Sequence, residues 1–157
     1  MVVCPEHICH QLPDGLSFQE AVFAEPVGVA LNAVNRSNAS TAETTVVIGA
    51  GLIGLLITQA LKTKECSEII AFDLVDSRLE LALKFGATMS VNSEDSDALE
   101  QALKRLGGKA DHAFEVVGAT PTVNLAVGLV KKGGKLRWWV ILHWKFNCRF
   151  RKSSPAS

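Results

Sequence analysis

Apolar and polar positions follow two alternating periods along the chain, and each change of period indicates a new element. Short apolar runs of four to eight residues predict buried strands. These runs cover residues 45–48, 68–72, 88–91, 111–117 and 135 to about 142. Stretches with apolar residues every three or four positions predict helices. These stretches cover residues 26–36, 52–62, 77–85, 95–106 and 120–130.

Strands that alternate with helices of about ten residues are typical of a parallel sheet that is covered on both faces. We therefore expect an α/β fold, a doubly wound Rossmann sheet of about five strands. A short N-terminal segment precedes it, in which Ser17 and Glu20 have the spacing of a capping box. Residues 37–44 are small and polar, which is typical of a connector. The expected α/β domain spans residues 41–142.

Composition narrows the classes of partner. The 157 residues carry no formal net charge, so no general attraction to nucleic acid or to an anionic membrane is expected. The longest apolar run, residues 46–57, is shorter than the roughly 20 residues of a membrane-spanning helix. Four cysteines lie without a framework spacing, and the N-terminus lacks the pattern of a signal peptide. We expect a cytoplasmic protein with reduced thiols.

The first apolar strand runs directly into a glycine-rich turn. The run Gly49-Ala50-Gly51-Leu52-Ile53-Gly54 matches G-x-G-x-x-G between an expected strand and an expected helix. Here Gly49 allows a tight turn, Gly51 lets the backbone approach a pyrophosphate, and Gly54 lets the helix pack on the strand. The N–H groups of Leu52 and Ile53 would point at the phosphates from the helix N-terminus. The turn therefore predicts a dinucleotide site.

The second expected strand ends in Asp73, nineteen residues after Gly54. A carboxylate at this position accepts hydrogen bonds from the ribose hydroxyls of an adenosine. It would repel the 2′-phosphate of NADP, and the next residues, Leu74, Val75 and Asp76, include no arginine that would neutralise this phosphate. We therefore expect NAD rather than NADP as the cofactor.

Two other classes of protein remain open at this point. A methyltransferase-like domain also uses a glycine turn and an acidic strand end to bind an adenosine, although Gly54 and the run from Asp73 to Arg78 favour a dinucleotide. A non-catalytic NAD-binding or interaction module would bind the cofactor without any turnover. Binding of S-adenosylmethionine separates the first class from a dehydrogenase, and an activity assay separates the second.

Further motifs extend the pattern on both sides of the turn. They are Leu12-Pro13-Asp14-x-Leu16-Ser17-x2-Glu20-Ala21, Glu25-Pro26, Asp73-x4-Arg78-Leu79-x2-Ala82-x3-Gly86-Ala87, Phe114-Glu115-Val116-Val117-Gly118 and Lys132-Gly133-Gly134. In this order they resemble the zinc-type medium-chain alcohol, sorbitol and threonine dehydrogenases, from about residue 2 to about residue 136. The resemblance implies NAD as cofactor, zinc in the intact enzyme, and reversible hydride transfer to or from a secondary alcohol or polyol.

The resemblance also implies roles for individual residues. The cofactor would be bound by Gly49, Gly51, Leu52, Ile53, Gly54, Asp73, Arg78 and Val117, with Arg78 near the adenosine ribose and Val117 bordering the cofactor after the fourth strand. Glu25 corresponds to a position that supplies, or adjoins, a ligand of the catalytic zinc. Without the family, Glu25 is an acidic residue stabilised at a helix N-terminus.

The chain departs from the family near its start. Met1 lies almost at the family's domain junction, so residues 1–40 are interpreted as a remnant of that junction, and no catalytic residue is identified. Cys4, His7, Cys9 and His10 have a spacing that matches no common zinc pattern. We therefore expect cofactor binding without dehydrogenase activity from this chain alone.

The chain departs from the family again after Gly134. From Lys135 onward it has six lysines or arginines, all three tryptophans and no acidic residue, which indicates a truncated or frame-shifted reading, or a divergent end. Residues 143–157 are interpreted as a divergent basic tail. A basic, aromatic tail can stack on nucleic-acid bases, but we expect no such partner. Apolar residues alternate from Leu136 to Phe146, which predicts a long edge strand that would favour a homo-oligomer.

Overall fold

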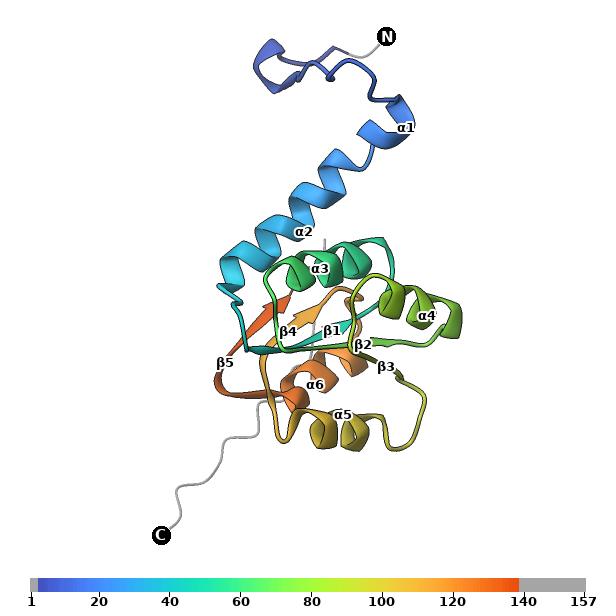
Figure 1. The fold of residues 1–157 in the computed structure, drawn as a ribbon, viewed down its shortest axis with the longest axis vertical. Coiled ribbons are helices and arrows are strands. Elements are labelled where there is room, and N and C mark those ends of the chain that lie inside the picture. Colours follow the sequence, from blue (N-terminus) through green and yellow to red (C-terminus); the bar gives the residue numbers. More distant parts are fainter. Residues whose placement is uncertain (1–2, 139–157) are drawn as a thin grey trace.

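The computed structural model describes residues 3–138, whose five strands form a parallel sheet between two layers of helices (Figure 1). The strands are β1 (Thr44–Ile48), β2 (Glu68–Asp73), β3 (Met89–Asn92), β4 (Ala110–Glu115) and β5 (Val130–Trp138). The helices are α1 (Phe18–Ala21), α2 (Ala24–Ser37), α3 (Leu52–Thr63), α4 (Asp76–Lys84), α5 (Ala98–Leu106) and α6 (Thr120–Leu129), and a short 3₁₀ turn, η1, spans Glu6–Ile8. The expected fold class is confirmed.

The strand order in the sheet is β3-β2-β1-β4-β5, and every neighbouring pair is parallel. The chain first builds outward from β1 to β3 and then returns to place β4 on the other side of β1. Loops that leave β1 and β4 therefore separate in opposite directions. At such a switch point the carboxyl ends of the strands border a crevice where ligands bind.

Alternating side chains of the strands fill two hydrophobic cores, one on each face of the sheet. On one face Val47 packs with residues of α2 and α3, and α4 covers the same face beside them. On the other face Val46 and Ile48 pack with residues of α5 and α6. Strands buried on both faces need apolar residues at almost every position, which is the pattern the sequence shows.

The observed element boundaries differ from the expected ones mainly at β5 and α5. Strand β5 begins at Val130 rather than at residue 135, and its pairing with β4 is irregular, since Ala110 pairs with Val130 but His112 pairs with Lys135. Gly133, at φ 78°, accommodates this irregularity in a conformation that other residues rarely adopt. Helix α5 begins at Ala98, three residues later than expected. The expected continuation of β5 beyond Trp138 lies outside the described residues.

The capping box expected at Ser17 is confirmed at the start of α1. The Ser17 hydroxyl accepts a hydrogen bond from the Glu20 backbone N–H at 3.2 Å, and the Glu20 carboxylate accepts one from the Ser17 N–H at 2.9 Å. The apolar residues that follow this cap are exposed, with Phe18 at 84% and Val22 at 68%. They are exposed because α1 and the segment before it project away from the sheet (Figure 1).

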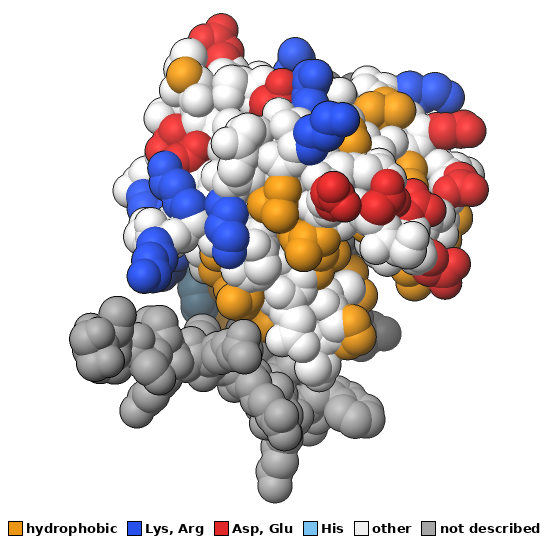
Figure 2. All heavy atoms as spheres, turned by 90° about the horizontal axis from the view of Figure 1, so that it is seen from below, with side chains coloured by type: hydrophobic (Ala, Val, Ile, Leu, Met, Phe, Trp, Pro, Cys, Tyr) orange, Lys and Arg blue, Asp and Glu red, His pale blue; other side chains and the backbone are white. Residues whose placement is uncertain are grey.

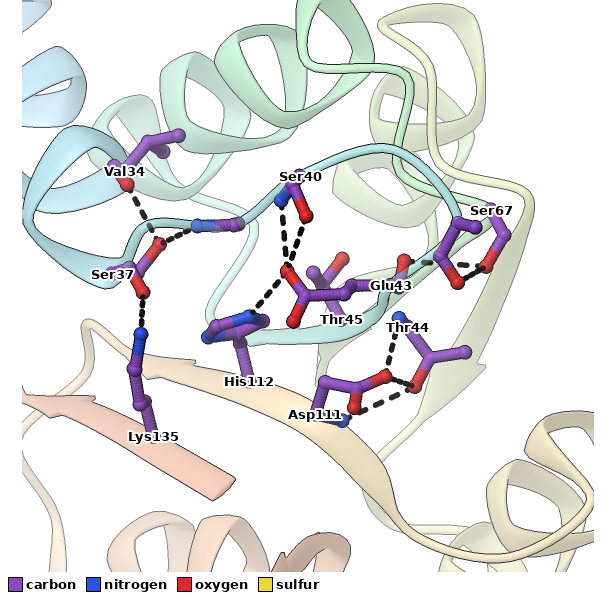
Figure 3. Close-up of polar contacts among 12 residues, drawn as sticks. Val34, Ser37, Ser40, Glu43, Thr44, Thr45, Ser67, Asp111, His112 and Lys135 are labelled. Atoms are coloured by element: carbon purple, nitrogen blue, oxygen red, sulfur yellow. Dashed lines mark hydrogen bonds and ion pairs between the residues drawn. The ribbon is translucent and has the colours of Figure 1, made fainter. Parts of the chain in front are cut away.

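Polar contacts connect β4 with β1 and with the loop before β1, at the end of the sheet opposite the carboxyl ends of the strands (Figure 3). The Asp111 carboxylate accepts hydrogen bonds from the Thr44 N–H and hydroxyl at 2.9 and 2.8 Å. Buried His112 lies 3.1 Å from a Glu43 carboxylate oxygen. These contacts join residues 67 and 69 positions apart, so they fix the alignment of β1 against β4.

The outer surface carries both signs of charge. On the face seen in Figure 2, basic and acidic side chains both occur, with exposed apolar side chains between them. Mixed charge of this kind produces little long-range attraction for a polyanion. Among the helices of residues 3–138, none combines the length and the apolar character needed to cross a membrane.

Candidate functional site

A cavity opens at the carboxyl ends of β1, β2 and β4, beside the switch point. Its volume is about 520 Å³, within the range typical of small-molecule sites. It is lined by Ile48, Gly49, Phe72, Asp73, Leu74, Val75, Arg78, Ser93, Val117, Ala119, Pro121, Thr122 and Leu125. Most of these side chains are apolar, so the few polar groups would determine how a ligand is oriented.

The glycine turn borders the cavity through Gly49, and two of its glycines are required by their surroundings. Gly49 has φ 102°, and its N–H donates to the Phe72 carbonyl oxygen at 2.7 Å. A Cβ on Gly54 would lie 1.7 Å from the Gly49 carbonyl oxygen, well inside contact distance. Gly54 therefore allows α3 to begin directly against the end of β1.

Gly51 differs from both of these, because nothing in the protein requires a glycine at its position. Its φ of −75° suits any residue, and a Cβ added there would meet no atom within 4 Å. Gly51 is also the N-cap of α3 and has no side chain to cap the helix. The first N–H groups of α3, including those of Leu52 and Ile53, lack intrahelical acceptors. Open space next to such donors is suited to an anionic group.

Asp73 ends β2, and its carboxylate is hydrogen-bonded to two loops. Oδ2 accepts from the Ala50 N–H at 2.7 Å, whereas Oδ1 accepts from the N–H groups of Leu74 and Val75 at 2.9 and 3.0 Å. Arg78 Nη1 lies 3.8 Å from Oδ1. Since a carboxylate has about four lone pairs, about one on Oδ2 remains for a ligand hydroxyl. The carboxylate thus combines a structural contact with capacity to bind.

Opposite Asp73, the loop after β4 borders the cavity with Val117, which is 51% exposed. Its Cγ2 would lie 2.7 Å from a Cβ on Gly49, so this loop packs closely against the glycine turn. Gly49 and Val117 therefore meet where β1 and β4 end. The structure brings together four of the expected site residues, Gly49, Asp73, Arg78 and Val117, around one cavity.

Glu115 holds the loop after β4 in place. It belongs to the motif Phe114-Glu115-Val116-Val117-Gly118, but no role was predicted for it. Its side chain is 1% exposed. Oε1 accepts hydrogen bonds from the N–H groups of Val117 and Gly118 at 3.0 and 2.9 Å, and from the Thr122 hydroxyl at 2.8 Å. Oε2 is buried and has no hydrogen-bond partner among residues 3–138. An acidic residue inside an apolar strand was the signal that could have identified it.

Glu25 lies apart from the cavity, in the first turn of α2, and it is exposed. A catalytic zinc takes three protein ligands. Among residues 3–138, no three His, Cys, Asp or Glu side chains lie close enough together to hold a metal ion. The described residues therefore do not by themselves fit a catalytic zinc centre.

Comparison with known proteins gives a consistent family match. The family model described as zinc-binding dehydrogenase matches residues 53–138. A probable D-xylulose reductase A of Aspergillus niger is 34% identical over 137 residues, which is 84% of this chain and 38% of the relative. An uncharacterized zinc-type alcohol dehydrogenase-like protein of Escherichia coli is 33% identical over 135 residues, again 84% of this chain and 38% of the relative.

Solved structures of similar proteins agree with these matches. An alcohol dehydrogenase from Thermus sp. ATN1 superposes with a TM-score of 0.81 and 27% identity, covering 90% of this chain and 41% of that one. A 2R,3R-butanediol dehydrogenase from Bacillus subtilis superposes with a TM-score of 0.78 and 32% identity, covering 88% of this chain and 40% of that one. The chain thus spans well under half the length of the relatives it matches.

Proposed function

Since this chain belongs to the zinc-binding dehydrogenase family, we propose that it is the NAD-binding part of an alcohol or polyol dehydrogenase. The proposed domain spans residues 41–142, with residues 1–40 as the junction toward the family's catalytic domain and residues 143–157 as a divergent tail. The observation that carries the proposal is the cavity at the β1–β4 switch point, which is lined by Gly49 of the glycine turn and by Asp73.

The residues around the cavity fit a dinucleotide in three respects. The pyrophosphate would be held against Gly51 by the N–H groups of Leu52 and Ile53, where no side chain of the protein fills the space. The adenosine ribose would donate a hydroxyl to the free lone pair of Asp73 Oδ2. The apolar walls, which include Val117 and Leu125, would exclude water from the bound cofactor. When bound, NAD supplies hydride acceptance and return at its nicotinamide ring.

The environment of Asp73 supports NAD over NADP. Its carboxylate is 9% exposed and lies where a 2′-phosphate would enter. Arg78 also lines the cavity, but its guanidinium lies 3.8 Å from Asp73 Oδ1 and is therefore already paired with a carboxylate. Two negative groups in contact at a partly buried site would repel each other strongly. We propose that this repulsion excludes the phosphorylated cofactor.

The substrate class is proposed from the relatives. Their names refer to a ketose, D-xylulose, and to a vicinal diol, 2R,3R-butanediol, which supports a secondary alcohol or polyol as the reacting group. Glu25 is proposed to lie at or beside a zinc ligand of a complete enzyme. Since the described residues do not fit a zinc centre on their own, we propose that this chain by itself binds NAD without measurable turnover.

Calorimetric titration of the purified chain with NAD, NADP and S-adenosylmethionine tests the proposal directly. We expect saturable binding of NAD, at least ~10-fold weaker binding of NADP, and no binding of S-adenosylmethionine. Binding of S-adenosylmethionine in place of NAD would refute the dehydrogenase assignment. Binding of neither nucleotide by a chain that remains folded, as judged by circular dichroism, would refute the cofactor site. An assay with NAD and a panel of polyols then tests the absence of turnover.

A further inference from the structure

Two cysteine side chains meet in the N-terminal segment, far from the proposed cofactor cavity. The Sγ atoms of Cys4 and Cys9 lie 3.3 Å apart, and either thiol can donate the hydrogen bond between them. Both cysteines are exposed and neither forms a disulfide. The segment that carries them projects from the sheet beyond α1 (Figure 1). Their proximity is therefore independent of the fold of the Rossmann sheet.

Local backbone structure holds the two thiols together. The residues between them form the 3₁₀ turn η1, in which the Ile8 N–H donates to the Pro5 carbonyl oxygen at 3.2 Å and the Cys9 N–H donates to the Glu6 carbonyl oxygen at 2.9 Å. Cys9 Sγ lies 3.6 Å from the Pro5 carbonyl oxygen. The proline ring fixes φ directly after Cys4, at −61°. The turn thus positions both sulfurs on the same side before any reagent arrives.

We propose that Cys4 and Cys9 form a reactive dithiol that is converted by low-molecular-weight disulfides, such as oxidised glutathione, into an intramolecular disulfide. The proposal rests on the geometry of η1 and does not depend on the proposed cofactor function. Two sulfurs in contact need only a small further approach to bond, whereas a single exposed thiol can only form a mixed disulfide.

The reaction is two successive thiol–disulfide exchanges. One cysteine loses its proton and its thiolate attacks a sulfur of the reagent disulfide, so that a mixed disulfide forms and one half of the reagent leaves as a thiolate, which then takes up the proton. The second cysteine then attacks the protein sulfur of the mixed disulfide and releases the second reagent thiol. In total, two protein thiols are oxidised to one disulfide and one reagent disulfide is reduced to two thiols.

The remaining described cysteine, Cys66, provides an internal control. It is 8% exposed, and burial raises the pKa of its thiol, with the negative charge of Glu43 acting in the same direction. Exchange requires a thiolate that the reagent can reach, so Cys66 is expected to react much more slowly. The hydrogen bond with Cys4 raises the pKa of the Cys9 thiol as well, but Cys9 remains accessible.

Peptide mapping after exposure of the native chain to oxidised glutathione tests the proposal. The sequence has no lysine or arginine before Arg36, so a tryptic digest places Cys4 and Cys9 on one peptide, 1–36, whereas Cys66 falls on 65–78 and Cys148 on 146–149. After an acid quench and alkylation of the free thiols, we expect peptide 1–36 to lack two hydrogen atoms and to carry no alkyl group. The variants Cys4→Ser and Cys9→Ser are expected to form only a glutathione adduct on this peptide.

A comparison of native and unfolded chain separates the geometry of η1 from mere closeness in sequence. The ratio of intramolecular disulfide to mixed disulfide gives the effective concentration of one thiol near the other. We expect this concentration to be at least ~10-fold higher in buffer than in concentrated urea, since the folded turn has already oriented both groups. Equal values in the two solvents would overturn the proposal, as would two glutathione adducts on native peptide 1–36.

Discussion

The carboxylate of Asp73 accepts a 2.7 Å hydrogen bond from the backbone N–H of Ala50, in the middle of the glycine turn. This bond joins the carboxyl end of β2 to the loop between β1 and α3. The residue proposed to bind the adenosine ribose therefore also fixes the turn proposed to bind the pyrophosphate. A change at Asp73 should act on both halves of the cofactor site at once.

Asp73→Asn is expected to weaken NAD binding by at least ~10-fold, because it removes the charge from the acceptor of three backbone N–H groups and of the proposed ribose hydroxyl. Binding of NADP should fall less, since the repulsion of its 2′-phosphate is also removed. Titration calorimetry on both cofactors measures the two changes. Glu80→Gln, on the exposed face of α4, makes the same change of charge nearby and should leave both affinities unchanged.

Gly54→Ala is expected to destabilise the fold by about 3 kcal/mol or more, because its Cβ would lie 1.7 Å from the Gly49 carbonyl oxygen and backbone must move to relieve the overlap. Urea unfolding followed by circular dichroism measures the loss.

Gly51→Ala, three residues earlier in the same turn, is the matched comparison. It meets no protein atom within 4 Å, so the free energy of unfolding should change by less than about 1 kcal/mol. Its methyl group would occupy the space proposed for the pyrophosphate, and NAD affinity should fall. Normal NAD binding by the Gly51→Ala variant would contradict the proposed position of the phosphates.

Glu115→Gln is expected to lower the free energy of unfolding by about 1–3 kcal/mol. Three donors converge on one oxygen of the Glu115 carboxylate. The glutamine amide that replaces it is a weaker acceptor, and its NH₂ group carries two protons of its own. The loop of Val117 and Gly118 should loosen and NAD affinity should fall as well. Urea unfolding and calorimetry measure the two effects. The exposed control Glu94→Gln should change neither, and equal behaviour of the two variants would disprove a role for Glu115.

The Asp111 carboxylate predicts a loss of stability in acid. Burial alone would raise its pKa, but hydrogen bonds from Lys131 and from Thr44 outweigh burial and lower the pKa to about 2, from an ordinary value of 3.8. A carboxyl whose folded pKa is depressed stabilises the fold above its unfolded pKa, and this contribution is lost as pH falls. We expect a loss of about 1–2 kcal/mol between pH 4 and pH 2, with the exposed lysine partner limiting its size.

Urea unfolding of the parent chain and of Asp111→Asn over this pH interval checks the expectation. The variant cannot titrate at this position, so its free energy of unfolding should be lower near neutral pH and should fall less steeply in acid. Parallel pH profiles for the two proteins would show that Asp111 does not contribute. Glu43, whose pKa is also lowered, remains in both proteins and accounts for part of the slope that they share.

Much of the fold and part of the site follow from the sequence because they depend on short-range patterns. The apolar runs predicted every strand of the sheet, and G-x-G-x-x-G with Asp73 located the cavity at the end of β1. Boundaries were less accurate where local signals conflict. At β5, the predicted start was residue 135, directly after Gly133 and Gly134, yet pairing with β4 extends the strand back to Val130 across an irregular register. Backbone pairing with the neighbouring strand thus extended β5 through two residues that are uncommon in strands.

The sequence by itself determined the order of strands and helices, the Rossmann class and the residues of the glycine turn, because periodicity and turn chemistry act within a few residues. Tertiary structure alone decided that Glu115 supports the loop of Val117, that His112 meets Glu43, and that Asp73, which the sequence predicts as a ribose ligand, also accepts a hydrogen bond from Ala50. Of these contacts, His112–Glu43 and Asp73–Ala50 join residues on different strands and loops. Whether a polar side chain is buried and which donors reach it depend on packing between elements, which no local pattern records.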